Sequence, residues 1–218
     1  KRFQTGLLAK ANRGYLYIDE VNLLEDHLVD LLLDVAQSGE NVVEREGLSI
    51  RHASRFILIG SGNPEEGELR PQLLDRFGLS VEVLTPDTVD ERIEVIKRRD
   101  DYDKDPEEYA ATWDKENRKL RNKIQKARKS LGSITVDSKI LEHCAQICID
   151  LGSDGLRGEL TLVRTARALA AFNGKERVDV GHIKTIAPMA LSHRLRRDPL
   201  DDAGSGTRVE RSVQKIIG

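Results

Sequence analysis

The sequence is poor in aromatic residues, cysteine and methionine, and it has no long apolar run. Aromatic side chains make up 4% of the 218 residues, so the core has to be built mainly from Leu, Ile, Val and Ala. A membrane-spanning helix needs about 18 consecutive apolar residues, and no such run is present, which predicts no membrane span. The first residues, KRFQTGLLAK, lack the apolar core of a signal peptide. We expect this start to be an interior point of a longer protein.

Charge of one sign is not in excess either. The chain has 35 Lys and Arg against 37 Asp and Glu, for a formal net charge of −2. A dedicated nucleic-acid-binding protein usually has a strong basic excess, so we predict no nucleic-acid partner and a surface rich in ion pairs. Cys144 and Cys148 lie four apart in an apolar helical pattern, which favours buried thiols over a disulfide or a metal pair. The five histidines are scattered, and only His143 has a second candidate ligand, Cys148, loosely at metal spacing. We predict structural or surface roles for all five.

Strand and helix patterns alternate through residues 1–87. The segments GYLYI (14–18) and RFILIGSGN (55–63) are typical of strands buried in a parallel sheet. The other elements expected here are a helix with its apolar face at Leu24 to Val35 that Gly39 ends, a β-hairpin at 42–50, a short helix at 70–77 and a third strand at 79–86. Strand, helix and strand in alternation predict an α/β layer sandwich.

The second part of the chain is predicted to be helical. Of the 43 residues from 88 to 130, 24 are Asp, Glu, Lys or Arg. Apolar residues keep helical spacing under these charges, which favours a long helix with one packed stripe over a nucleic-acid surface. Three helices follow, the third containing Pro188, and then a connector, DDAGSG, and a short final helix. We therefore divide the chain into an α/β part (1–87), a charged helical linker (88–133) and a helical domain (134–218).

Two adjacent carboxylates, Asp19 and Glu20, directly follow the first strand. Ligands of α/β sheets bind at the carboxyl ends of the strands, and splitting a phosphoanhydride needs a metal that neutralises charge and a positioned water. We predict that Asp19 holds Mg²⁺, directly or through water, and that Glu20 orients or deprotonates the attacking water. The alternative is a strand that runs into an N-capped helix and binds no metal.

Three further residues extend this candidate site. Asn63 ends the second strand, where a neutral amide can hold the water or contact the γ-phosphate; by itself, Asn63-Pro64 is turn chemistry. Arg76 follows the short helix and is either a solvated surface charge or an arginine finger that reaches a neighbouring subunit's nucleotide, with Asp75 orienting it. Arg157 opens a helix between two glycines and is a candidate phosphate contact from the helical domain.

The order Asp-Glu, Asn, Arg and a second Arg in a helical domain resembles Walker B, sensor 1, arginine finger and sensor 2 of AAA+ ATPases. Longer blocks resemble subunit I of magnesium chelatase, a family of AAA+ ATPases, in its bacteriochlorophyll type. The similarity covers nearly the whole chain and is carried by GLLAKANRGYLYIDEVNLLEDHLVDLLLD, VVEREGLSI, GSGNPEEGELRPQLLDRFGL, GSDGLRGELTLVRTARA and ALSHRLRRDPLDDAGSG.

The resemblance implies properties that spacing does not show. These are an AAA+ three-layer core followed by an all-helical domain, ATP and Mg²⁺ as cofactors, and a ring of copies, a hexamer, that share their ATP sites. It also implies D and H partner subunits and Mg²⁺ insertion into protoporphyrin IX, in a bacterial cytoplasm or a chloroplast stroma. By motif, the site residues are Asp19 and Glu20 (Walker B), Asn63 (sensor 1), Arg76 (arginine finger) and Arg157 (sensor 2). The hairpin at 42–50 resembles the pre-sensor insertion.

The Walker A loop of that family, G-x-x-x-x-G-K-[ST], is absent from the 218 residues. Without its backbone N–H groups and its lysine, the β- and γ-phosphates lose their main anchor. We expect this loop to precede Lys1 and expect this chain alone to hydrolyse no ATP. Two other hypotheses stay open. One is a MoxR-like or chelatase-like remodelling ATPase that acts on protein or DNA, and the other is a ring-forming interaction module with a vestigial ATP site.

Overall fold

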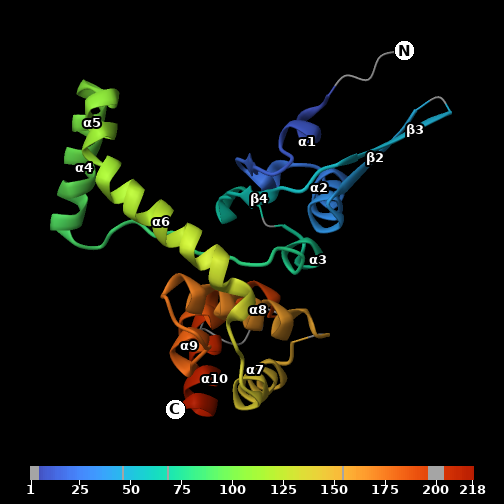
Figure 1. The fold of residues 1–218 in the computed structure, drawn as a ribbon, viewed down its shortest axis with the longest axis vertical. Helices are drawn as coiled ribbons and strands as arrows, with labels where there is room; N and C mark the ends of the chain where they lie inside the picture. Colours follow the sequence, from blue (N-terminus) through green and yellow to red (C-terminus); the bar gives the residue numbers. More distant parts are fainter. Residues whose placement is uncertain (1–4, 46, 68, 154, 196–203) are drawn as a thin grey trace. The chain divides into compact units, whose positions relative to one another are not determined.

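The structure, a computed structural model, describes residues 5–45, 47–67, 69–153, 155–195 and 204–218. The chain divides into two compact units, Lys1–Gly78 and Leu79–Gly218, whose elements are drawn in Figure 1. In the described residues, all the strands belong to the first unit, whereas the second unit is built from helices. The predicted division at 87 and 133 stays a prediction.

Two short parallel strands form the centre of the first unit. Strand β1 (Tyr15–Ile18) pairs in parallel with β4 (Ile57–Gly60) along its whole length. The side chain of Leu16 points into the core and is buried. Both predicted strands and their adjacency are confirmed, but the strands are not buried on both sides, because Tyr15 and Tyr17 of β1 and Ile57 and Ile59 of β4 are exposed. Because the strands run in the same direction, their carboxyl ends meet at one edge of the sheet.

Helix α2 (Asp26–Ser38) packs its apolar face beside this strand pair. Leu33 and Val35 are buried on it, and Val35 belongs to the same apolar cluster as Leu16 of β1. Gly39 ends the helix in the left-handed conformation, with φ of 75°, which glycine adopts without a Cβ clash. The predicted helix and its glycine end are confirmed. The predicted apolar face is only partly buried, because Leu24 precedes the helix and Leu28 and Leu31 are exposed.

The segment after α2 forms the predicted hairpin. Strands β2 (Glu40–Arg45) and β3 (Leu48–Ala53) pair antiparallel. Gly47, in the connection, has φ of 80°, a value that favours glycine; residue 46 lies outside the described residues. Short elements complete the unit: α1 (Leu7–Lys10), the 3₁₀ turns η1 (Val21–Leu23) and η2 (Pro64–Glu66), and α3 (Pro71–Leu74).

The prediction of a third strand at 79–86 is wrong. These residues carry no strand assignment, and Val83 and Leu84 are 89% and 73% exposed. A strand needs hydrogen bonds to a neighbouring strand, and the sheets of the described residues contain only the pairs β1–β4 and β2–β3. The alternation in LSVEVL marks a segment suited to a sheet, but the pattern cannot supply the partner.

The charged segment at 88–130 is helical, but the prediction of one long helix is wrong. It consists of α4 (Val89–Lys104), α5 (Pro106–Thr112) and α6 (Asp114–Ser130). Asp105 ends α4 and caps α5, because its side chain accepts a hydrogen bond from the N–H of Glu108 at 2.8 Å. Pro106 follows at the first position of α5, where no intrahelical hydrogen bond needs its missing N–H. Inside a continuous helix, Pro106 would remove a backbone hydrogen bond and kink or break the helix.

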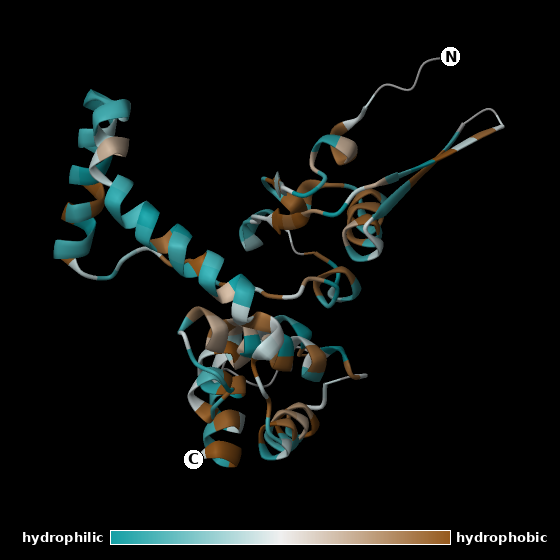
Figure 2. Ribbon diagram, in the orientation of Figure 1, coloured by the Kyte–Doolittle hydropathy of each residue, from teal (hydrophilic) through white to brown (hydrophobic). Residues whose placement is uncertain are grey.

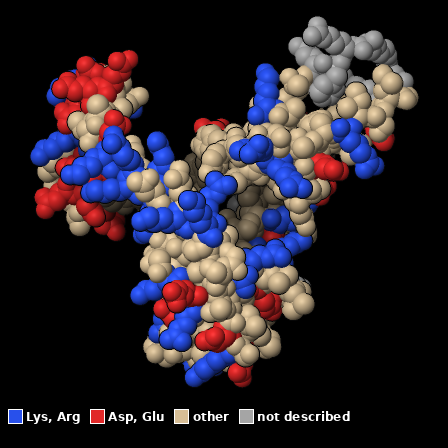
Figure 3. Space-filling view, viewed as in Figure 1, with Lys and Arg blue, Asp and Glu red and all other residues tan. Residues whose placement is uncertain are grey.

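The apolar stripe predicted under these charges is only partly packed. Ala127 of α6 is buried, but Leu120 and Ile124 remain 48% and 44% exposed. Figure 3 shows acidic side chains gathered over α4 and α5 and basic side chains along α6. The charges therefore cover a solvated surface, as predicted. Aromatic side chains at Tyr102, Tyr109 and Trp113 contact one another, but Ala127, near the end of α6 that meets the helical core, is the only buried residue of the described segment 88–130.

The predicted helices of the C-terminal part are confirmed. They are α7 (Ser138–Asp150), α8 (Arg157–Phe172), α9 (Val180–Leu191) and the final α10 (Ser205–Ile217). Their apolar faces, brown in Figure 2, enclose one core that includes Ile147, Leu162 and Ile183. Pro188 lies in the last turn of α9. Residues 201–203 of the predicted connector DDAGSG lie outside the described residues, and Ser205 and Gly206 of it begin α10. None of the described helices has both the length and the apolar character needed to cross a membrane.

The two cysteines are buried free thiols, as predicted. Cys144 and Cys148 each expose 1% of their surface and form no disulfide. Burial raises the pKa of Cys144 to about 11 and that of Cys148 to about 12. His182, also buried, has a structural role, because it forms a reciprocal cap with Asp179 at the start of α9.

Candidate functional site

The carboxyl ends of β1 and β4 are joined by main-chain hydrogen bonds. The N–H of Ser61 donates to the carbonyl of Ile18 at 3.0 Å, and the N–H of Val21 donates to the carbonyl of Ser61 at 2.8 Å. Asp19 and Glu20 follow β1, and Ser61 to Asn63 follow β4. The polar residues of the two strands therefore lie at the same edge of the sheet, as the sequence predicts.

Asp19 is an exposed carboxylate held by two hydroxyl groups. Its Oδ1 accepts hydrogen bonds from Ser61 Oγ and, at 3.0 Å, from the Tyr17 hydroxyl. These bonds, that of Ser61 first, keep the pKa of Asp19 below its ordinary value. The side chain is therefore ionised near neutral pH, as a metal ligand has to be.

Glu20 has an unusual backbone conformation. Its φ and ψ are 51° and 50°, in the left-handed region, which costs a non-glycine residue about 1–2 kcal/mol. The N–H of Glu20 donates to Ser61 Oγ at 3.2 Å. This turn reverses the chain directly after β1 and leads into η1, so the Glu20 side chain starts from a fixed point beside Asp19.

Asn63 connects the two chain segments through its backbone and caps a turn with its side chain. Asn22 Nδ2 donates to the Asn63 carbonyl at 3.3 Å, and Asn63 Oδ1 accepts from the N–H of Glu65 at 3.0 Å, which caps η2. Because the side-chain oxygen is used in this cap, the amide nitrogen is the group of Asn63 that can donate to a phosphate or a water.

The Asp19 carboxylate fits as a ligand of a magnesium ion that is bound together with phosphates. Mg²⁺ is usually bound through one or two carboxylates, several waters and the substrate's phosphates, not by a full protein cage. Asp19 is an exposed, ionised carboxylate at the carboxyl end of β1, where it can supply one such ligand. The described residues contain no group of three or more His, Cys, Asp or Glu arranged to hold a metal by themselves. The site therefore suits a metal–nucleotide complex better than a bare ion.

Arg76 is held by helix α2 of its own unit. Its Nη1 lies 2.5 Å from Asp30 Oδ1, its Nη2 is paired with Asp34, and its side chain is only 19% exposed. Arg70 is paired in the same way with Asp26 at 2.6 Å. Arg76 is therefore not a solvated surface charge, and a helix far away in sequence holds its guanidinium group.

Arg157 is the first residue of α8 in the second unit. Gly155, just before it, has φ of 71°, and Gly158 packs tightly, because a Cβ there would lie 2.9 Å from Ser153 Oγ and 3.3 Å from Leu191 Cδ2. Close packing is thus found at Gly158 within the helical unit, whereas a Cβ on Gly155 would meet no atom within 4 Å. The placement of Arg157 at the nucleotide stays a prediction.

Comparisons with known proteins agree at both ends of the chain. Residues 1–73 match the family model of magnesium chelatase, subunit ChlI, and residues 141–216 match that of the AAA lid domain. The whole chain is 66% identical to the magnesium-chelatase 38 kDa subunit of Cereibacter sphaeroides. The chain belongs to the magnesium chelatase subunit I family. It is also 53% identical to the chloroplastic magnesium-chelatase subunit ChlI of Nicotiana tabacum, again over its full length.

The chain spans 65% of the length of the Cereibacter relative and 51% of the Nicotiana relative. A solved structure of a putative ATPase from Cytophaga hutchinsonii shares the fold over 93% of this chain and 65% of its own, with a TM-score of 0.66 at 19% identity. One chain in a structure of the complex between subunits BchI and BchD of magnesium chelatase is 60% identical in sequence. The match covers 97% of this chain and 63% of that chain, with a TM-score of 0.39. The fold is α/β of the AAA+ type, followed by helices.

In this magnesium chelatase family member, sequence reasoning missed the residues that hold the site together. Ser61 and Tyr17 contact the Asp19 carboxylate, and Asp30 and Asp34 hold Arg76. The acidic spacing of α2 is a visible signal, because residues four apart share one face of a helix. Its arginine partner, 42 and 46 positions along the chain, is not visible from that spacing.

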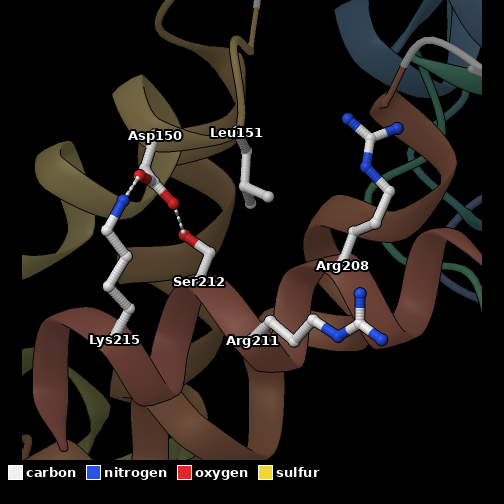
Figure 4. A pocket seen from close by; sticks show the side chains of 6 residues that line it. All are labelled: Asp150, Leu151, Arg208, Arg211, Ser212 and Lys215. Atoms are coloured by element: carbon white, nitrogen blue, oxygen red, sulfur yellow. Dashed lines mark hydrogen bonds and ion pairs between the residues drawn. The ribbon is translucent and has the colours of Figure 1, made fainter. Parts of the chain in front are cut away.

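A separate hollow of about 230 Å³ lies between α7 and α10. Figure 4 shows Asp150 at its edge, accepting hydrogen bonds from Ser212 (2.7 Å) and Lys215, with Arg208 and Arg211 on the other side. Lys215 and then Ser212 lower the pKa of Asp150. These contacts join α10 to α7, so we interpret the cluster as a structural link between two helices of the lid.

Proposed function

We propose that this chain is the larger part of an ATP-hydrolysing motor subunit of magnesium chelatase. The reaction is the ATP-dependent insertion of Mg²⁺ into protoporphyrin IX, on the route to chlorophyll or bacteriochlorophyll. One observation carries the proposal. An ionised Asp19 lies beside Glu20 at the joined ends of β1 and β4, in a chain 66% identical to a magnesium-chelatase subunit.

Each site residue has a proposed task in ATP hydrolysis. Asp19 holds the nucleotide's Mg²⁺, which when bound neutralises charge on the phosphates. Glu20 orients the attacking water and takes its proton, and the side-chain amide of Asn63 donates to the water or the γ-phosphate. Arg157 contacts the phosphates from the lid. The Mg²⁺ that is inserted into the porphyrin is substrate, and we place it on a partner subunit.

Arg76 acts at the nucleotide of a neighbouring copy in a ring, for which the family implies a hexamer. For this task the guanidinium group has to exchange the carboxylates of Asp30 and Asp34 for phosphate oxygens, which are also bidentate acceptors. We propose subunits D and H as partners, with D assembling on the ring and H holding the porphyrin. The location is the cytoplasm of a bacterium or the stroma of a chloroplast.

The 218 residues contain no G-x-x-x-x-G-K-[ST] sequence, so the main phosphate anchor has to come from elsewhere in the full-length protein. We propose that this chain alone hydrolyses no ATP. Magnesium-dependent ATP turnover by the purified 218-residue chain, absent from a Glu20→Gln preparation made in parallel, would contradict this.

The function is tested by reconstitution. The full-length protein is mixed with D and H subunits, ATP, Mg²⁺ and protoporphyrin IX, and Mg-porphyrin is measured by its fluorescence. We expect product with the wild type and none with Glu20→Gln. ATP hydrolysis without Mg-porphyrin, stimulated instead by a protein or DNA client, would favour the remodelling alternative.

A further inference from the structure

We propose that Ser61 is a positioning residue that sets the Asp19 carboxylate and the Glu20 backbone for catalysis. The inference rests on the proposed function, because it assigns Ser61 to the same magnesium–nucleotide site. Ser61 touches neither reacting atom in this account; it acts through Asp19 and Glu20.

The polar groups of Ser61 bind the end of β1 and the segment that follows it. Its N–H and carbonyl bond to Ile18 and Val21. Its hydroxyl donates to Asp19 Oδ1 and accepts from the Glu20 N–H at 3.2 Å. The Tyr17 hydroxyl, whose one hydrogen is donated to Asp19 Oδ1, lies 3.2 Å from Ser61 Oγ. A serine hydroxyl has one hydrogen to donate and two lone pairs, so the hydrogen and one lone pair of Ser61 are used in the site.

The hydroxyl controls the direction in which the Asp19 carboxylate faces. A carboxylate rotates about its Cβ–Cγ bond unless its oxygens are bound, and the bonds from Ser61 and Tyr17 both reach Oδ1. Tyr17 is 60% exposed, whereas Ser61 is fixed through its backbone on both sides. Ser61 is therefore the stronger restraint on the carboxylate.

The same hydroxyl supports the strained turn at Glu20. The left-handed conformation of Glu20 persists only where its surroundings hold it, and its N–H is bound by Ser61 Oγ. The neighbours of Ser61 are glycines, and a Cβ on Gly60 would lie 3.0 Å from Val21 Cγ1, while one on Gly62 would lie 2.8 Å from Asn22 Oδ1. These glycines let the end of β4 approach Val21 and Asn22 closely, so that the Ser61 hydroxyl reaches the Asp19 carboxylate and the Glu20 N–H.

The test compares Ser61→Ala, Ser61→Cys and Ser61→Thr in the full-length protein. Cysteine keeps the size but is a weak donor, and threonine keeps the hydroxyl. Three quantities are measured: the thermal midpoint, the affinity for a fluorescent ATP analogue without and with Mg²⁺, and kcat for ATP hydrolysis. Ser49→Ala, which removes an exposed hairpin hydroxyl that contacts Glu44 at 3.4 Å, is the matched control.

We expect Ser61→Ala and Ser61→Cys to bind the analogue normally without Mg²⁺. The Mg²⁺ concentration that tightens binding should rise, and kcat should fall by about 10–100-fold, the usual loss when a residue that orients a metal ligand is removed. Ser61→Thr should keep most of the wild-type Mg²⁺ response and kcat, and Ser49→Ala should change neither the Mg²⁺ response nor kcat. If Ser61→Ala fails to fold, the folded Ser61→Cys variant decides.

A Ser61→Cys protein with the wild-type Mg²⁺ response and kcat would overturn the inference. So would Ser61→Ala and Ser61→Thr variants with equal losses, because the hydroxyl would then not be the group that matters. Asp19→Asn separates this failure from failure of the proposed function. If Asp19→Asn responds to Mg²⁺ like the wild type, the metal site itself is wrong; if only the Ser61 variants are unaffected, the role of Ser61 alone is wrong.

Discussion

At the scale of single residues, Glu20 combines two constraints. It lies in the left-handed region of the backbone, where glycine or asparagine is more usual, and it follows directly after the carboxylate of Asp19. Backbone strain of this kind clusters at functional sites, and at Glu20 it lies beside a carboxylate that the proposal places at the nucleotide.

Replacing Glu20 by Gln keeps the size of the side chain and removes its ability to accept a proton. We expect the full-length Glu20→Gln protein to bind ATP with normal affinity and to lose about 10²–10⁴-fold in kcat, the range for a general base. Glu25→Gln is the control, because Glu25 is 76% exposed and its ion pair in the described residues is with the exposed His27. Steady-state ATP hydrolysis and analogue binding are the measurements. Equal kcat values for the two variants would rule out the role of Glu20.

The cysteines give a test of the helical core. Burial, followed by the nearby charge of Glu159, raises the pKa of Cys144 to about 11 and that of Cys148 to about 12. Because the thiolate is the reactive form, we expect both thiols to react with a disulfide reagent at pH 8 far more slowly in the native protein than in urea. Rapid native labelling of either cysteine would show that the core opens.

At the scale of elements, Asp150 links α7 to α10. Lys215 and Ser212 hold its folded-state pKa below the ordinary value, so the carboxylate stabilises the fold above the ordinary pKa near 3.8, and the contribution is lost as the pH falls through the folded pKa. We expect Asp150→Asn to lower the thermal midpoint at pH 7. The difference from the wild type should shrink at about pH 3. An unchanged difference would contradict the role of the ionised group.

The pairing of Arg76 with α2 makes a second prediction at this scale. The carboxylates of Asp30 and Asp34 are 53% and 71% exposed, so solvent screens each pair. We expect the Asp30→Asn/Asp34→Asn variant to lose about 1 kcal/mol of unfolding free energy, measured by urea denaturation. Asp87→Asn, an exposed change outside this cluster, is the control. A loss no larger than the control's would mean that the pairs do not restrain Arg76.

Local sequence patterns predicted most of the helices and strands. One error came from a predicted strand that has no neighbouring strand in the described residues, and the other from a helix break hidden by the charge pattern. Apolar runs identified β1 and β4, and alternation around Gly47 identified the hairpin, because these signals are contained in a few consecutive residues. The strand expected at 79–86 failed because strand formation depends on a neighbour. The break at Asp105-Pro106 was visible as a cap followed by a proline, but the charge pattern on both sides suggested one helix.

The candidate site shows the same limit. Asp19, Glu20 and Asn63 were found because each directly follows a strand. Ser61 was missed because its importance comes from hydrogen bonds that span 41 to 44 positions of the chain. A polar residue that directly follows a strand can be recognised in the sequence as a candidate site residue. A residue that orients it from a different strand can be recognised only when the pairing of the two strands is known.

At the scale of the whole molecule, the proposal requires sites shared between copies. An Arg76→Ala subunit keeps Glu20 and a Glu20→Gln subunit keeps Arg76, so each lacks a different half of a shared site. We expect each full-length variant alone to lose about 10²-fold or more in ATP hydrolysis and mixed rings to recover a fraction of it. No recovery, with mixed assembly verified by a tag on one variant, would contradict action across the subunit interface.

The central claim is that Asp19, at the joined ends of β1 and β4, holds the metal that accompanies the nucleotide. Electron paramagnetic resonance tests it directly, with Mn²⁺ in place of Mg²⁺. The full-length protein is titrated with Mn²⁺ in the presence of a non-hydrolysable ATP analogue, alongside Asp19→Asn and, as control, Asp26→Asn. We expect a tightly bound Mn²⁺ in the wild type and in the control, and its loss in Asp19→Asn. Equal Mn²⁺ binding by Asp19→Asn and the wild type would contradict it.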